Sequence, residues 1–327
     1  AGWNVVTSWL DGSARNYGRP EHYAHGVRYR LAAEHLDVVQ GLWDSWDDDA
    51  FVRDRDSGTF FAPEKFRRLD HKGRFFQVEG PLNIQRSPQG QPVIFQAGAS
   101  DDGIALAGKY ADAVFTHAPS LEETRAFTQK VKNAAIAHGR SAADVKIFPG
   151  IGPIVGATAE DAEAKYQAIA ALAGLDDALA YLGRFFDHHD FTQYDPDGPF
   201  PELGDIGANS FRSTTDKIKL DARAHGLTLR QVALQAVSPR PNFIGTAEHV
   251  ADELIRWFEA GASDGFILGF SVQREGLDDF VSQVLPILQA RGYHRGTLEG
   301  GTLRDHLGLP RKASRHAGDT APVRKAG

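Results

Sequence analysis

The chain has 327 residues, of which 42% are hydrophobic and 24% charged, a composition typical of globular proteins. Its formal net charge of −7 disfavours a nucleic-acid-binding surface, and no apolar run reaches the length of a membrane span. The lack of cysteine excludes disulfides and thiolate chemistry. We therefore expect no nucleic-acid partner and no membrane association.

The first residues, Trp3–Ser8, have the pattern of a β-strand rather than the charged and then apolar segments of a signal peptide. We therefore expect a cytoplasmic protein. The chain contains no methionine, and a domain rarely begins inside a strand. We also expect that further chain precedes Ala1.

A loop over Gly12–Pro20 and a helix from His22 to about Trp46 are predicted next, the helix from apolar residues at 3.6-residue spacing. A long irregular insertion, about residues 47–91, follows. Its length is typical of a functional lid or cap over a site. Four aromatic residues are expected to anchor it: Phe60, Phe61, Phe75 and Phe76.

From residue 93 onward, strands and helices alternate. The predicted strands are Val93–Ala97, Ala113–Thr116, Val145–Ile154 and Gly265–Leu268. One predicted helix follows the strand Val93–Ala97 and ends at Tyr110. The other predicted helices cover Leu121–His138, Ala159–Ala173, Ala247–Ala260 and Leu277–Ala290. A second irregular insertion, about residues 174–241, is expected to contain two short helices, near Thr214–Ala224 and Thr228–Val237. Residues 295–327 are expected to form a C-terminal arm that ends in disorder.

This alternation predicts an α/β protein with a parallel sheet. With Trp3–Ser8, five strands are predicted. Five units could form an open doubly wound sheet, or they could be the last five units of a TIM (β/α)8 barrel. The strand count does not separate these two architectures.

A candidate ligand-binding turn follows the strand that begins at Val93. Gly98, Ala99 and Ser100 keep this turn slim, and Ser100 or Asp101 can cap the helix that follows. The free N–H groups of a helix N-terminus and a serine hydroxyl together favour binding of a phosphate.

A second candidate pair is His25 and Tyr29, which are four residues apart and therefore on one face of the first long helix. They offer an imidazole and a phenol to a polar ligand. From spacing alone, such a pair is more often a helix face packed against the insertion.

Blocks along nearly the whole chain resemble the nitrilotriacetate and dibenzothiophene-sulfone monooxygenases of the bacterial-luciferase-like superfamily. These blocks are Trp3–Ser8, His25–Tyr29, Leu42–Trp46, Lys72–Phe76, Gly80–Asn83, Gln96–Ser100, Gly245–Glu248, Ala251–Phe266 and Thr302–Leu309. The resemblance implies a luciferase-like TIM barrel of which residues 1–294 form the last five βα units. The first three units of the family, with further flavin and substrate contacts, are not in this sequence.

The resemblance also implies an FMN-dependent, two-component monooxygenase. Reduced FMN would come from a separate NAD(P)H:flavin reductase, O2 would be the co-substrate, and the protein would be a homo-oligomer. The flavin contacts of the family fall on Asn4, His25, Tyr29, Ala99 and Ser100. Because the flavin carries the chemistry, we assign no catalytic protein residue, and no metal-ligand spacing is present.

Two alternatives remain open. The chain could be a non-catalytic flavin-binding or dimer-partner remnant of the family, or a deazaflavin-dependent oxidoreductase of the same superfamily. The substrate could be an aminopolycarboxylate, an organosulfur compound or a similar xenobiotic, since no spacing selects the pocket residues.

Overall fold

The computed structural model describes residues 1–8, 11–207 and 212–317. Two compact units are present. The first contains residues 1–150, 257–267 and the C-terminal arm from Arg295, and the second contains residues 151–256 and 268–294. Within the described ranges, no helix is both long enough and apolar enough to span a bilayer.

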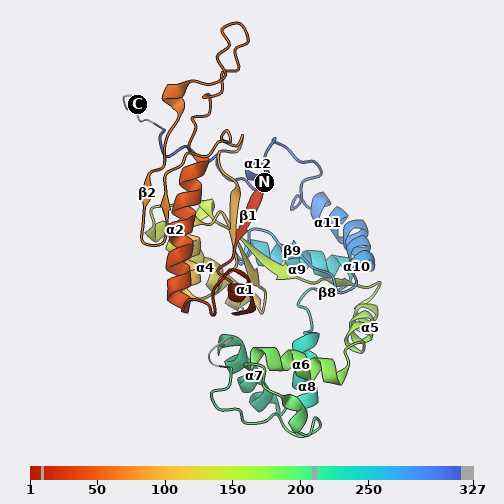
Figure 1. Cartoon of the computed structure of the whole chain (residues 1–327). Coiled ribbons are helices and arrows are strands. Elements are labelled where there is room, and N and C mark those ends of the chain that lie inside the picture. The colour runs from red at the N-terminus through yellow and green to blue at the C-terminus, as the bar shows by residue number, and fades with distance from the viewer. Residues whose placement is uncertain (9–10, 208–211, 318–327) are drawn as a thin grey trace. The chain divides into compact units, whose positions relative to one another are not determined.

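A five-stranded sheet forms the centre of the first unit (Figure 1). Its order is β1 (Gly2–Val5), β4 (Val93–Gln96), β5 (Ala113–His117), β6 (Lys146–Ile151) and β9 (Ile267–Leu268). The pairs from β1 through β6 are all parallel. The predicted α/β class is therefore confirmed, and neighbouring strands follow each other in chain order as in a section of a TIM barrel.

Three helices, α2 (His25–Trp43), α3 (Asp101–Tyr110) and α4 (Leu121–Ala137), pack on one face of this sheet. Strand residues alternate between the two faces, so every second apolar residue meets a helix. Val5 and Ile94 are buried against α2, and Val114 and Ile147 are buried near α3 and α4. The opposite face has aromatic residues, among which Phe95 and Phe148 stack with centroids 6.2 Å apart.

Strand boundaries differ most from the predicted ones in β1 and β6. Strand β1 ends at Val5 rather than at Ser8. The predicted strand Val145–Ile154 is interrupted, because Ile154–Val155 forms β7, which pairs with β8 (Ile244–Gly245) in a separate parallel sheet. Pro153 stands at the break, where its missing N–H cannot continue a ladder.

The second unit is mainly helical. Its helices are α5 (Ala159–Ala170), α6 (Leu175–Phe185), α7 (Arg212–His225), α8 (Leu229–Val237), α10 (Gln273–Asp279), a π-helical turn (Phe280–Val284) and α11 (Leu285–Ala290). Helix α9 (Ala247–Glu259) begins in the second unit, and its last residues belong to the first. Short 3-10 turns cover Pro63–Lys65, Ala142–Asp144 and Phe191–Gln193.

Helices α7 and α8 confirm the two short helices predicted in the second insertion, whereas α6 and α1 (Asp11–Asn16) were not predicted. In the second insertion, α6 buries Leu179 and Leu182 in a core shared with α8, so this segment has its own hydrophobic cluster. The predicted loop Gly12–Pro20 begins within α1. The apolar residues of α6 recur at helical spacing, so the sequence did contain the pattern of this helix.

The first insertion lies at the C-terminal end of α2, beyond which it extends in Figure 1. Trp46 anchors it: the indole N–H donates to the Leu82 carbonyl at 2.8 Å, and the ring packs on Phe51, Phe61 and Phe66. Phe60, expected as an anchor, is 59% exposed. Because His25 begins α2 at the other end, the insertion is not a lid over the carboxyl ends of the strands.

Glu34 of α2 holds the short hairpin of this insertion, β2 (His71–Lys72) and β3 (Gln77–Val78). Its carboxylate accepts hydrogen bonds from the backbone N–H groups of Arg74, Phe75 and Phe76. The hairpin is therefore fixed to the side of α2.

The C-terminal arm, which includes α12 (Leu303–His306), packs against the amino-terminal ends of the strands. Arg304, 2% exposed, donates to both carboxylate oxygens of Asp112 and to the carbonyls of Gln91 and Pro92. Asp112 in turn accepts from the Ile94 N–H at 2.9 Å. This buried ion pair joins the arm to the starts of β4 and β5. Residues 318–327, where disorder is expected, lie outside the described residues.

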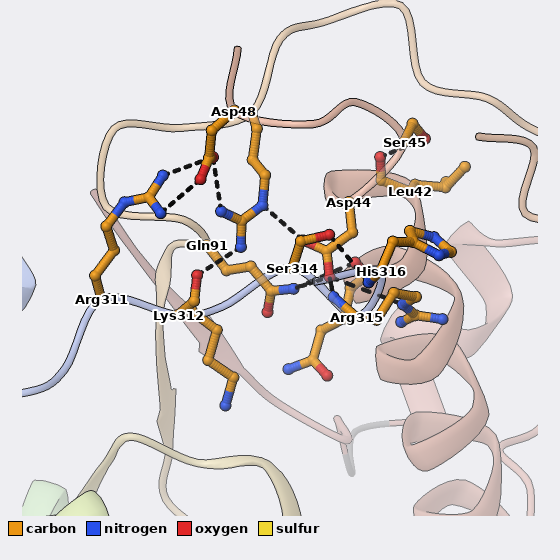
Figure 2. Close-up of polar contacts among 12 residues, drawn as sticks. Leu42, Asp44, Ser45, Asp48, Gln91, Arg311, Lys312, Ser314, Arg315 and His316 are labelled. Carbon is orange, nitrogen blue, oxygen red and sulfur yellow. Dashed lines mark hydrogen bonds and ion pairs between the residues drawn. The ribbon is translucent and has the colours of Figure 1, made fainter. Parts of the chain in front are cut away.

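The arm makes a second polar network with the insertion (Figure 2). Arg311 binds both oxygens of Asp48 at 2.7 and 2.6 Å, and the buried Arg86 bridges Asp44, Asp48 and the Lys312 carbonyl. The hydrogen bonds from Arg311, with those from Arg86, lower the pKa of Asp48 to about 2.

We predict that Arg304→Met lowers the free energy of unfolding by about 3–5 kcal/mol, because it leaves the buried Asp112 carboxylate unpaired. Urea denaturation measures this change. Arg223→Met is the matched control, since Arg223 and its partner Glu202 are mostly exposed and such pairs contribute about 0–1 kcal/mol. Equal losses in the two variants would contradict the prediction.

We predict that the Asp48 network loses its stabilising effect in acid. The folded-state pKa is depressed, so the contribution is complete above the unfolded pKa near 3.8 and disappears as the pH falls toward 2. Urea midpoints between pH 5 and pH 2.5 should therefore fall less steeply in Asp48→Asn than in the unmodified chain. Parallel pH profiles would show that the network does not couple folding to protonation.

Candidate functional site

The turn after β4 brings its backbone very close to α2 and α3. A Cβ placed on Gly98 would lie 2.6 Å from the Tyr29 hydroxyl, against the Gln96 amide nitrogen, and 3.2 Å from the Gly103 Cα. An added Cβ would therefore have to displace the ends of the Tyr29 and Gln96 side chains and would crowd the Gly103 Cα. This close packing favours glycine here, in agreement with the slim turn predicted from the sequence.

Ser100 is the N-cap of α3. Its hydroxyl accepts a hydrogen bond from the Gly103 N–H at 3.2 Å, so the cap is Ser100 rather than Asp101. In the described part of the chain, the N–H groups of Asp101 and Asp102 have no hydrogen-bond acceptor. The first turn of α3 thus offers two free donors beside a serine hydroxyl.

His25, the first residue of α2, lies directly beside this cap. Its Nε2 is 3.4 Å from the Ser100 Oγ, and its Nδ1 is 3.1 Å from the Asp102 Oδ2. The rings of His25 and Tyr29 are 4.8 Å apart, and within the described residues the Tyr29 hydroxyl has no hydrogen-bond partner. The structure therefore brings His25, Tyr29 and Ser100 together from two helices.

Asn4 and Ala99 stand apart from these three side chains. Asn4 is exposed and pairs in register with Phe95, so it lies on the sheet face opposite to α2. Ala99 is exposed in the turn, where it contributes backbone next to Ser100. The five residues surround the carboxyl ends of β1 and β4 without forming one contact cluster.

Two polar groups of this region were not expected from the sequence. Asp102 orients His25, but no spacing rule connects residues 77 positions apart. The buried Gln96 side chain has an amide oxygen without a hydrogen-bond partner in the described structure. Such an unsatisfied buried acceptor next to a turn is consistent with a ligand that donates a hydrogen bond.

The donor set of the site fits a phosphate group. A hydroxyl, an imidazole and free helix-terminal N–H groups converge on one point, where the positive end of the α3 dipole favours an anion. Within the described ranges, no group of three or more histidine, aspartate and glutamate residues is arranged to hold a metal ion.

Comparison with known proteins identifies the family of the chain. The family model for luciferase-like monooxygenases matches residues 1–264. The chain belongs to this family. The N-acetyl-S-(2-succino)cysteine monooxygenase of Bacillus subtilis (strain 168) is 42% identical over 97% of the chain and 72% of its own length. The nitrilotriacetate monooxygenase component A of Aminobacter aminovorans is 41% identical over 95% of the chain and 69% of its own length.

Solved structures of this luciferase-like family confirm the fold. The crystal structure of DmoA from Hyphomicrobium sulfonivorans is 37% identical, with a TM-score of 0.81 over 94% of the chain and 65% of DmoA. A riboflavin lyase crystallised with modified FMN and riboflavin is 32% identical, with a TM-score of 0.79 over 94% of the chain and 68% of the lyase. The chain thus spans about two thirds of these structures' lengths.

We predict that Gly98→Ala destabilises this turn, because the added methyl group must displace the Tyr29 hydroxyl and the Gln96 amide. A loss of about 1–3 kcal/mol in the free energy of unfolding is expected, as for overpacking. Gly296→Ala is the control, since Gly296 has open space around it and, like Gly98, no positive φ. Equal losses in the two variants would show that crowding is not decisive at Gly98.

Proposed function

We propose that the chain is the oxygenase component of a two-component, FMN-dependent monooxygenase that oxygenates a small organic compound. The observation that carries the proposal is the convergence of His25 and Ser100 at the N-terminus of α3, at the carboxyl end of a parallel strand. This is the position at which α/β barrels place their ligand sites. Reduced FMN, when bound, supplies the electrons that activate O2.

In this proposal the protein residues bind and orient the flavin. Ser100, the amide groups that follow Ala99, and His25 hold the phosphate, while Asp102 keeps the imidazole of His25 turned toward Ser100. The free Tyr29 hydroxyl donates to the phosphate or the ribityl chain. Asn4, on the Phe95 face of the sheet, contacts the flavin farther from the phosphate.

The partners and organisation expected from the sequence belong to the same proposal. A separate NAD(P)H:flavin reductase supplies the reduced FMN, in keeping with the name "component A" of the Aminobacter relative. Residues 1–294 act as a partial barrel, with residues 295–327 as an arm on it. We further propose a homo-oligomer that works in the cytoplasm, where the reductase finds NAD(P)H.

The substrate class stays broad. Relatives of similar identity are named for N-acetyl-S-(2-succino)cysteine, nitrilotriacetate, dibenzothiophene sulfone and dimethyl sulfide, with identities from 42% to 37%. Such close values do not favour one of them. An aminopolycarboxylate, an organosulfur compound or a similar xenobiotic all suit the proposal.

We predict that Ser100→Ala weakens FMN binding by roughly tenfold and leaves riboflavin binding unchanged, because only FMN carries the phosphate. Fluorescence titration of the chain with each flavin measures both constants. Ser120→Ala is the matched control, since Ser120 caps α4 with the same 3.2 Å bond to a backbone N–H. Equal weakening of both flavins, or equal effects of both serines, would contradict the assignment.

Oxygen consumption tests the activity itself. The chain is mixed with FMN, NADH and a flavin reductase, and uptake of O2 is followed with each candidate substrate and without one. Substrate-dependent uptake with an oxygenated product supports the proposal. Flavin binding without such uptake would favour the non-catalytic alternative.

A further inference from the structure

A second polar cleft lies in the first unit, at the amino-terminal ends of the strands. Its volume is about 430 Å³, on the scale of small-molecule sites, and its lining includes Asp112, Asp144, Arg140 and Lys312. Asp112 directly precedes β5, and Asp144 comes just before β6. Ser100 follows the carboxyl end of β4, so this cleft and the candidate flavin site belong to opposite ends of the sheet.

Most charges around the cleft are already paired. Arg304 neutralises Asp112 through two hydrogen bonds. Asp37 lies 3.8 Å from the Lys109 ammonium and accepts a hydrogen bond from the Tyr110 hydroxyl at 3.0 Å. These pairs contribute polarity to the cleft but no net charge.

Two cations of the lining lack a carboxylate partner. The Arg140 guanidinium donates only to carbonyl oxygens, those of Ala107, Gly108, Ala111 and Asp144. Among the described residues, the Lys312 Nζ has neither a hydrogen-bond nor an ion-pair partner, although the backbone of Lys312 is bonded to Gln89 and Arg86. In Figure 2 its side chain points away from the network around Asp44 and Asp48.

The remaining carboxylate does not balance both cations. Asp144 closes the capping box of a 3-10 turn by accepting from the Ser141 N–H at 2.9 Å. Burial lowers the pKa of Lys312 despite the attraction of Asp112, as expected for an ammonium that lacks a close counter-charge. With Arg140 and Lys312 against Asp144, the cleft has an excess of one positive charge.

We propose that this cleft binds a small oxyanion, a phosphate or carboxylate group. The Lys312 ammonium is the main ligand of the anion, and the positive charge of Arg140 adds electrostatic attraction. The shared chemistry is a compact anionic oxygen cluster, from inorganic phosphate or from a small carboxylic acid. Because Lys312 comes from the C-terminal arm and Arg140 follows α4, a bound anion bridges the arm and the helical layer. This site is independent of the proposed flavin chemistry.

Isothermal titration of the full chain with inorganic phosphate, and separately with malonate, tests the proposal in a buffer without other oxyanions. At least one of the two anions should bind saturably at the cleft, and Lys312→Met should weaken that binding by roughly tenfold or more. Lys312→Arg should retain it. Lys130→Met, which removes an exposed lysine of α4, is the control for net charge and should leave binding unchanged.

The flavin site needs a separate control, because its phosphate seat could also take up inorganic phosphate. Binding at the cleft should persist in Ser100→Ala and in the presence of FMN. Loss of binding in Ser100→Ala but not in Lys312→Met would overturn the proposal, as would the absence of saturable binding of both anions. Since the Lys312 side chain makes no hydrogen bond, its variants should fold, and thermal unfolding checks this.

Discussion

Parallel pairing of β1 with β4 is the constraint on which the candidate site depends. In a parallel βα unit, each helix begins near the carboxyl end of its strand, so helices from neighbouring units begin side by side. The four register pairs between β1 and β4 therefore bring the start of α2 next to the start of α3. His25 and Ser100, 75 residues apart, meet for this reason.

The other end of the same sheet has a different character. There the strands begin, and buried arginines contribute to joining the C-terminal arm to them. Arg304 binds a carboxylate and backbone carbonyls, and Arg86 does the same for the insertion and the arm. Breaking such a buried pair is costly, so these contacts specify where the arm lies. Arg140 and Lys312 differ from Arg304 and Arg86, because neither has a carboxylate partner among the described residues.

The first insertion shows how far length alone can mislead. Its 45 or so residues suggest a lid. Yet Glu34 and Trp46 tie it to the side and the C-terminal end of α2, away from His25. A long connection can equally be a segment that packs on the fold without covering a site. Only the contacts of its backbone and aromatic groups distinguish such a segment from a lid.

The sequence by itself determined the α/β class, most helices and the existence of all five strands of the main sheet, because apolar periodicity and capping residues act over a few positions. It also identified the Gly98–Ser100 turn and the His25–Tyr29 pair, since both are local patterns. Tertiary structure alone decided the contact of His25 with Asp102, the position of the insertion and the pairing of Arg304 with Asp112. These interactions join residues 77, about 40 and 192 positions apart, and no local rule reaches across such distances.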